Sequence, residues 1–453
     1  MVKVDKIIPG GQALGTLDNG KKIFFWNALP GEIVSEYRIT KNKSHYIEAI
    51  ATNIENPSPF RVAPKDDCFL STSPWQIINY NYELKLKSEL VAEIFREHQI
   101  NITSPPVITD GHDYYYRNKM EYTFSNKKWL TFEQMRSGEE FPDRDAAGFH
   151  ISGAFDKVLD INCCHLQDDF GNRLRLFIKQ FGKENGYSFY DLKAQQGLLR
   201  TLMIRIASTG EIMAVMVFGE DDTVKIKSIL EAIKVNFPEI TSLLYVINLK
   251  VNDTISDQEI IKYTGKDYIE EEMEGLRFRV GAKSFYQTNS LQAYELYKVA
   301  RNFAELTGSE LVYDLYTGTG TIANFVARQA KKVIGIEYVE DAIADAKINS
   351  ANNGIANTEF YAGDMKDVLT DSFIEAHGRP DTMIVDPPRA GMHEDVVNVI
   401  LNASPRRIVY VSCNPATQAR DLALLDCKYK VEAIQPVDMF PHTHHVENVV
   451  KLS

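Results

Sequence analysis

The chain has 453 residues, of which 44% are hydrophobic and 25% charged, and its formal net charge is −12. This length predicts two or three domains of an ordinary globular kind. The negative charge argues against a generic polyanion binder, and five cysteines are too few for a disulfide framework. The sequence shows no long apolar run and no apolar leader. We therefore expect no membrane partner, a cytoplasmic location and, by default, a monomer.

Residues 1–62 contain several short β-rich runs. The clearest are 21–26, 32–39 and 46–54, and turn-forming residues precede or separate them. Short strands at this spacing predict a small β-barrel. Residues 1–65 hold nine Lys/Arg against six Asp/Glu, so this segment could hold phosphate by charge. The alternative is an ordinary solvated surface.

The central segment, 63–280, has a mixed character. A helical pattern covers residues 82–98, and 118–125 reads as a strand. The apolar run 212–218 predicts a buried strand. We expect a separate central α/β domain here.

The C-terminal segment, 281–453, alternates short apolar strands with helices. The predicted strands are 311–315, 333–336, 383–385, 408–411 and 446–450, and the predicted helices include 322–329 and 341–352. This βαβ rhythm predicts a doubly wound, Rossmann-like parallel sheet. Ligands bind such sheets at the carboxyl ends of the strands.

A glycine-containing loop follows the first of these strands. In Asp314-Leu315-Tyr316-Thr317-Gly318-Thr319-Gly320-Thr321, the glycines let a ligand approach the backbone. Glu337 ends the next strand, where a carboxylate can bind two ribose hydroxyls. Asp364 follows a third strand and could meet an adenine edge. Ala323 replaces the third glycine of the dinucleotide fingerprint, which favours S-adenosylmethionine over a dinucleotide.

Three further motifs follow later strands. They are Asp386-Pro387-Pro388-Arg389-Ala390-Gly391, Ser412-Cys413-Asn414-Pro415 and the segment 437–447, which contains His442, His444, His445 and Glu447. The prolines of the first motif fix its backbone. On its own, Cys413 could be a buried structural cysteine. The histidines have no nearby cysteine at ligand spacing, so we predict no metal site.

These motifs resemble the signatures of the RNA 5-methyluridine methyltransferase family. The segments 386–391 and 412–417 match its first signature and 438–447 its second, while 117–119 and 284–289 also resemble family segments. The barrel resembles the family's RNA-binding TRAM domain. The resemblance implies Cys413 as nucleophile and Glu447 as general base. It also implies cofactor contacts from Gln287, Tyr316, Glu337 and Asp386, beside those expected of Gly318 and Asp364.

The chemistry of uracil accounts for these residue types. Carbon 5 is too weak a nucleophile to accept a methyl group unaided. Addition of a thiolate to carbon 6 activates it, so we expect a lowered pKa for Cys413 in the assembled site. A base such as Glu447 must then remove the carbon 5 proton. The target base has to leave its stack or loop to reach the thiol.

The sequence departs from many family members at a cluster-binding segment. Those members hold an iron–sulfur cluster with three close cysteines and a distant fourth. Here Cys68 remains, the next two ligands are absent, and Cys163-Cys164 resembles the region of the fourth. We therefore expect no iron–sulfur cluster.

Other functions stay open at this point. A dinucleotide oxidoreductase would share the glycine loop and Glu337 but would leave the motif around Cys413 unexplained. A cytosine-directed methyltransferase would be expected to place its cysteine in a different motif. A non-catalytic RNA-binding or folding factor would keep the barrel and could lose Cys413 or Glu447, yet both are present. Because family members with the barrel resemble ribosomal RNA enzymes more than transfer RNA enzymes, we expect 23S rRNA as the substrate rather than tRNA.

Overall fold

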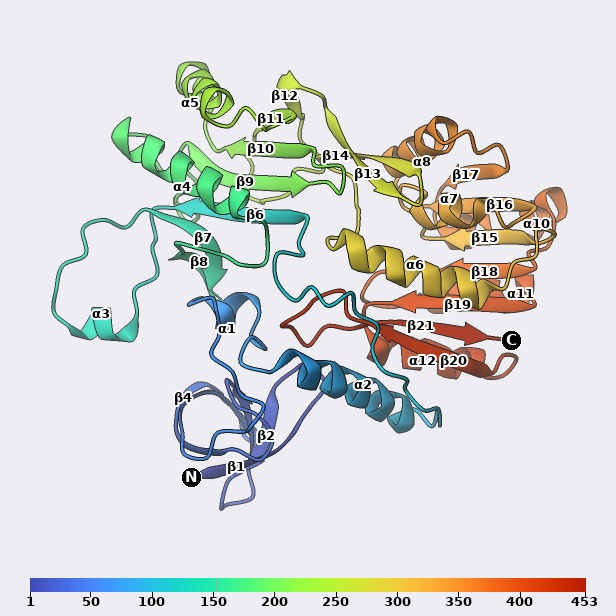
Figure 1. The fold of residues 1–453 in the computed structure, drawn as a ribbon, viewed down its shortest axis with the longest axis horizontal. Coiled ribbons are helices and arrows are strands. Elements are labelled where there is room, and N and C mark those ends of the chain that lie inside the picture. The colour runs from blue at the N-terminus through green and yellow to red at the C-terminus, as the bar shows by residue number, and fades with distance from the viewer. Residues whose placement is uncertain (152) are drawn as a thin grey trace. The chain divides into compact units, whose positions relative to one another are not determined.

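The N-terminal residues form a closed five-stranded barrel in the computed structural model, which describes residues 1–151 and 153–453 (Figure 1). Its order is β1-β2-β3-β5-β4, with β1 Val2–Ile7, β2 Ala13–Thr16, β3 Lys22–Trp26, β4 Ile33–Asn42 and β5 Tyr46–Ile54. Alternate side chains point inward along β3 and β5, and Ile23, Phe25 and Ala49 are at most 1% exposed. The predicted barrel is confirmed, and it gains two strands, β1 and β2.

A buried ion pair fixes the chain where it leaves the barrel. The Glu32 carboxylate is fully buried and accepts hydrogen bonds from Arg61 Nε at 2.7 Å and Nη2 at 2.8 Å. It also accepts the Leu29 amide at 2.7 Å, across the turn at Gly31 (φ +86°). The turn 29–32 is thus tied to the segment that follows the barrel.

Two compact units divide the chain. The first comprises Met1–Pro64, Ser73–Asp113 and Leu291–Ser453, and the second Lys65–Thr72 and Tyr114–Ser290. Helix α2 (Tyr80–Glu97), predicted at 82–98, belongs to the first unit together with the barrel. The division into three domains at 1–62, 63–280 and 281–453 remains a prediction.

The first unit also contains a seven-stranded sheet. Its order is β17-β16-β15-β18-β19-β21-β20, with β15 Leu311–Leu315, β16 Lys332–Glu337, β17 Thr358–Ala362, β18 Thr382–Val385, β19 Arg407–Ser412, β20 Val431–Val437 and β21 Glu447–Leu452. The first five strands are parallel, and β21 runs antiparallel to β19 and β20. The helices of this half are α6 Ser290–Ala304, α7 Thr321–Ala327, α8 Glu340–Asn352, α9 Met365–Val368, α10 Asp371–His377, α11 Glu394–Ala403 and α12 Pro415–Leu425. The predicted doubly wound α/β fold is confirmed.

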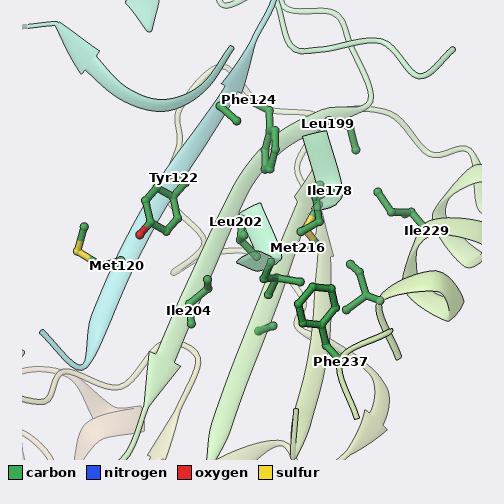
Figure 2. Close-up of a cluster of buried hydrophobic side chains, with 14 of the residues drawn as sticks. Met120, Tyr122, Phe124, Ile178, Leu199, Leu202, Ile204, Met216, Ile229 and Phe237 are labelled. Carbon is green, nitrogen blue, oxygen red and sulfur yellow. The ribbon is translucent and has the colours of Figure 1, made fainter. Parts of the chain in front are cut away.

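The second unit is built on another seven-stranded sheet. Its order is β12-β11-β10-β9-β6-β7-β8, with β6 Lys119–Ser125, β7 Ala146–Ile151, β8 Ala154–Asp160, β9 Leu199–Ile206, β10 Ile212–Phe218, β11 Ser242–Ile247 and β12 Ile261–Gly265. The other elements are α1 Phe69–Thr72, α3 Phe132–Arg136, α4 Asp169–Glu184, α5 Thr223–Asn236 and the hairpin β13 Tyr268–Met273 with β14 Leu276–Gly281. Every residue of β10 is buried, as its apolar run predicts. Figure 2 shows its Met216 packed with side chains of β6, β9 and α4 in the core of this unit.

Among residues 1–151 and 153–453, no helix is both long and apolar enough to cross a bilayer.

Candidate active site

The glycine loop after β15 turns sharply to bring two predicted residues together. Tyr316, Gly318 and Gly320 all have positive φ (+62°, +55° and +75°), a conformation that glycine adopts without strain. The loop places the Gly318 amide 3.2 Å from Glu337 Oε2, at the end of β16. The other carboxylate oxygen accepts the Val339 amide at 3.0 Å. Gly318 and Glu337 therefore form one corner at the carboxyl edge of the sheet.

Tyr316 and Asp364 lie on the same edge. Burial raises the pKa of Tyr316 to about 12, and the negative charge of Asp364 adds to this effect. Asp364 follows β17 and caps the short helix α9 by accepting the Lys366 amide at 3.2 Å. The Gly363 amide donates to the Glu337 carbonyl at 2.8 Å, which joins this turn to the same corner. Asp364 thus has a structural role, and its contact with an adenine edge remains a prediction.

Three predicted residues meet where β18, β19 and β21 lie side by side. Asp386 follows β18, Cys413 follows β19 and Glu447 begins β21. The register pairs Ser412 with Asn448, so the thiol and the Glu447 carboxyl belong to neighbouring positions of an antiparallel pair. Cys413 is half-buried and Glu447 is 3% exposed. The structure brings together the proposed nucleophile, the proposed base and Asp386.

The electrostatics of this group oppose ionisation. Burial raises the pKa of the Cys413 thiol to about 11, with the charges of Glu447 and Asp386 adding to it and Arg389 acting against it. Burial also raises the pKa of Glu447 well above its usual range. Burial, then the neighbouring Asp314, raises the pKa of Asp386 to about 7. The combined effect of the protein's own groups is therefore a raised thiol pKa, whereas the reaction requires a lowered one.

The two halves of the first signature hold each other in place. The Arg389 carbonyl accepts hydrogen bonds from Asn414 Nδ2 at 3.1 Å and from Thr417 Oγ1 at 3.2 Å. Asn414 also caps α12, which begins at Pro415, two residues after Cys413. The Arg389 guanidinium contacts His445 Nδ1 at 2.9 Å. Hydrogen bonds of Arg389 thus join the segment 386–391 both to the start of α12 and to the loop before β21.

A buried ion cluster holds the loop that leads into Glu447. Lys87 of α2 is fully buried, and its ammonium donates to Asp438 Oδ1 at 2.6 Å and to the Phe440 carbonyl at 3.1 Å. Its ion pair with Glu83 measures 2.8 Å, and Glu83 accepts the His442 amide at 2.8 Å. Sequence reasoning missed Lys87 and Glu83, because both look like polar positions of an amphipathic helix.

Gln287 lies in the second unit, whereas the other seven predicted site residues lie in the first. Gln287 is 8% exposed, and its carbonyl accepts Asn118 Nδ2 at 2.9 Å. The Asn118 amide donates to the Thr288 carbonyl at 2.8 Å. The two family-like segments 117–119 and 284–289 are therefore joined to each other.

The cysteines of the cluster-like region also lie in the second unit. Cys68 and Cys164 are buried in its core, and Cys163 is exposed, with its sulfur 3.6 Å from His165 Nε2. Within residues 1–151 and 153–453, no group of three or more His, Cys, Asp or Glu side chains could hold a metal ion. That statement includes His442, His444 and His445.

A family model and several known proteins match this chain. A family model described as tRNA (Uracil-5-)-methyltransferase matches residues 225–453. The chain is 55% identical over 449 residues to an uncharacterized RNA methyltransferase of Bacteroides thetaiotaomicron, covering 98% of both chains. It is 54% identical over 462 residues to another from Porphyromonas gingivalis, covering 100% of this chain and 99% of that one.

A solved structure resembles the whole chain. The crystal structure of Pyrococcus abyssi tRNA (uracil-54, C5)-methyltransferase in complex with S-adenosyl-L-homocysteine gives a TM-score of 0.77 at 27% identity, covering 100% of both chains. The family match and the relatives confirm the resemblance drawn from the sequence motifs. The chain belongs to the tRNA (uracil-5-)-methyltransferase family, a family of S-adenosylmethionine-dependent RNA methyltransferases.

Proposed function

We propose that this protein forms 5-methyluridine in RNA, with Cys413 as covalent nucleophile and Glu447 as general base. The observation that carries the proposal is the meeting of Cys413, Glu447 and Asp386 at the ends of three adjacent strands. In parallel α/β sheets this edge is where ligands bind. Membership of the uracil-5 family supports the target atom.

The residues at this edge fit S-adenosylmethionine. Among the described residues, no ion pair reaches Asp386 or Glu447, so their buried carboxyls would favour a cationic ligand. When bound, the cofactor supplies an electron-poor methyl group and the positive charge of its sulfonium. Glu337, Gly318, Tyr316 and Asp364 would hold its nucleoside and amino-acid parts, and Gln287 stays a cofactor contact that the family resemblance implies.

The protein's own groups would act in a fixed order. The Cys413 thiolate adds to uracil carbon 6, forming a carbon–sulfur bond and moving an electron pair toward the carbon 4 oxygen. Carbon 5 then takes the methyl group, and the bond from that group to the donor sulfur breaks. Glu447 accepts the carbon 5 proton, the carbon–sulfur bond breaks and Cys413 leaves as a thiolate. Glu447 can accept this proton only as a carboxylate, so a positive charge beside it would have to offset the burial that raises its pKa.

The thiol has to ionise before it can add. A positive charge beside Cys413 lowers its pKa, in the direction opposite to burial and Glu447. Arg389 already acts in that direction. We expect cofactor binding to complete the shift, so cofactor and thiolate would depend on each other.

The barrel presents a face suited to RNA. Lys22, Lys41 and Lys43 are exposed, and the rings of Phe24 and Tyr46 lie 5.6 Å apart on the neighbouring strands β3 and β5. The Lys41 ammonium lies 5.5 Å from the Tyr46 ring and forms an exposed ion pair with Glu48 at 2.9 Å, which a phosphate would have to replace. Phosphate-binding cations beside aromatic rings are typical of single-stranded RNA binding. We propose that the barrel binds the RNA substrate in the cytoplasm, and that the protein acts as a monomer.

The proposed substrate is 23S ribosomal RNA, on the strength of the barrel. Transfer RNA is the second candidate, because the structurally similar Pyrococcus abyssi protein is a tRNA (uracil-54, C5)-methyltransferase that matches over its whole length. The labelling experiment that follows separates the two substrates.

A labelling experiment tests both parts of the proposal. Purified protein is incubated with labelled S-adenosylmethionine and either unmodified 23S rRNA or unmodified tRNA, and digestion with mass spectrometry locates 5-methyluridine. Label in rRNA that vanishes with Cys413→Ala supports substrate and mechanism. Label in tRNA alone overturns the substrate and leaves the mechanism. No label in either RNA, despite cofactor binding, favours a non-catalytic RNA-binding role.

A further inference from the structure

The loop between β20 and β21 (residues 438–446) packs against the barrel at His444. The His444 ring lies 6.1 Å from the Trp26 ring of β3 and 6.5 Å from the Trp75 ring. Trp75 Nε1 donates to the Gly11 carbonyl at 3.0 Å, and the Trp75 amide donates to the His442 carbonyl at 3.0 Å. Trp75 therefore joins the barrel to this loop on either side of His444.

The surroundings of Gly11 show how closely the barrel packs against the loop 438–446. A Cβ atom at Gly11 would lie 2.5 Å from His444 Cβ and 2.6 Å from its Cγ, well inside van der Waals contact. The neighbouring Gly10 would meet nothing within 4 Å. Both glycines have positive φ, +98° at Gly10 and +85° at Gly11. Of these two glycines, Gly11 alone is in close contact with the loop.

His444 is also linked to the reacting groups, through His445 and Arg389. Its ring lies 4.1 Å from the His445 ring, and His445 Nδ1 contacts Arg389 Nη2 at 2.9 Å. Arg389 is the cation that acts on both Cys413 and Glu447. His444 is half-buried, its Nδ1 has no hydrogen-bond partner among the described residues, and burial lowers its pKa to about 4. A neutral ring of this kind acts through its shape.

We propose that His444 is a positioning residue through which the barrel sets the place of Arg389 beside Cys413 and Glu447. The inference rests on the proposed function and extends it, because the barrel would then support catalysis as well as hold RNA. Small displacements of reacting groups reduce rates strongly, by up to about 10²-fold for 1 Å. The barrel would thus bind the RNA and also help to position Arg389 in the site where that RNA reacts.

The two glycines give a matched test in the full-length protein. Gly11→Ala should lower kcat about 10-fold or more and leave the Kd for RNA within about twofold. Gly10→Ala carries a similar backbone strain and should match the wild type in kcat. Equal losses in both variants would overturn the proposal, because strain alone would explain them. Weaker RNA binding with an unchanged kcat in Gly11→Ala would also overturn it, since the barrel would then be only a tether.

A second pair of variants tests the shape of the ring. His444→Ala should lower kcat, whereas His444→Phe should retain most of it, because the phenyl ring keeps the packing. Loss of activity in both variants, with thermal unfolding unchanged, would contradict a role through shape.

A readout without RNA separates this inference from the proposed function. The alkylation rate of Cys413 by iodoacetamide is followed against pH, with mass spectrometry to distinguish it from the exposed Cys163 and Cys427. Displacing Arg389 should move the alkylation midpoint to higher pH in Gly11→Ala and not in Gly10→Ala. An unchanged midpoint overturns the coupling. A shifted midpoint in a protein that forms no 5-methyluridine would support the coupling and reject the proposed function.

Discussion

Two clusters of buried charged groups in the first unit are built in opposite ways. In the Lys87 cluster (Lys87, Glu83 and Asp438), every charge has an opposite partner, at 2.6 Å and 2.8 Å from the ammonium. In the Cys413 cluster (Cys413, Asp386 and Glu447), the carboxyls have no ion-pair partner among the described residues, and burial raises the pKa of all three groups. Removing one partner from a paired buried charge strongly destabilises the fold, whereas buried ionisable groups with shifted pKa values are typical of functional sites. We therefore expect substitutions in the Cys413 cluster to change activity, and substitutions in the Lys87 cluster to change stability.

The largest expected effect is on activity in the Cys413 cluster. Cys413→Ser should reduce 5-methyluridine formation at least about 10³-fold, because a serine hydroxyl does not ionise near neutral pH. The free energy of unfolding should change little. Methylation assays and urea unfolding measure both, with Cys427→Ser as the control, since that thiol is exposed. Retained activity would reject the covalent mechanism.

Loss of the proposed base should block the end of the reaction. Glu447→Gln should lower turnover by about 10²- to 10⁴-fold, because the amide cannot take the carbon 5 proton. RNA should then accumulate as a covalent adduct on Cys413, visible on a denaturing gel. The double variant with Cys413→Ala should form no adduct. Turnover at the wild-type rate would assign the base to another residue.

The Lys87 cluster should respond through stability. Lys87→Met leaves Asp438 and Glu83 buried without their cation, which should cost about 3–5 kcal/mol of unfolding free energy. Lys85→Met on the same helix is the control, because its pair with Glu89 is exposed and should contribute less than about 1 kcal/mol. Urea unfolding gives both values. Similar losses in the two variants would show that burial of the pair has no special effect.

The smallest effect is a dependence of stability on pH. The pKa of Asp386 is raised to about 7 in the folded protein, against about 3.9 for an unfolded chain. The folded state therefore holds the extra proton between these values, and stability falls as pH rises through this window. Asp386→Asn removes that loss, so the variant should gain unfolding free energy relative to wild type at pH 8 and gain much less at pH 5. An equal difference at both pH values would contradict the shifted pKa.

Local patterns predicted most of the parallel sheet. The strands β15, β16, β18 and β19 were expected within one residue at each end, because short apolar runs buried on both faces leave a clear signal. Strand β20 was not predicted. It lies at the edge of the sheet, and Glu432, Gln435 and Pro436 break its apolar pattern. The strand forms through its antiparallel pairing with β21, which its own apolar pattern does not indicate.

The sequence by itself determined which residues end the strands of the sheet. Since parallel strands share one carboxyl edge, that was enough to group Gly318 with Glu337 and Asp386 with Cys413. Only the tertiary structure decided what surrounds them. Lys87 and Asp438 are 351 residues apart in the chain, and the contact of Gly11 with His444 spans nearly its whole length. Burial and charge at such contacts set the pKa of Cys413, and they depend on packing between segments that no local pattern connects.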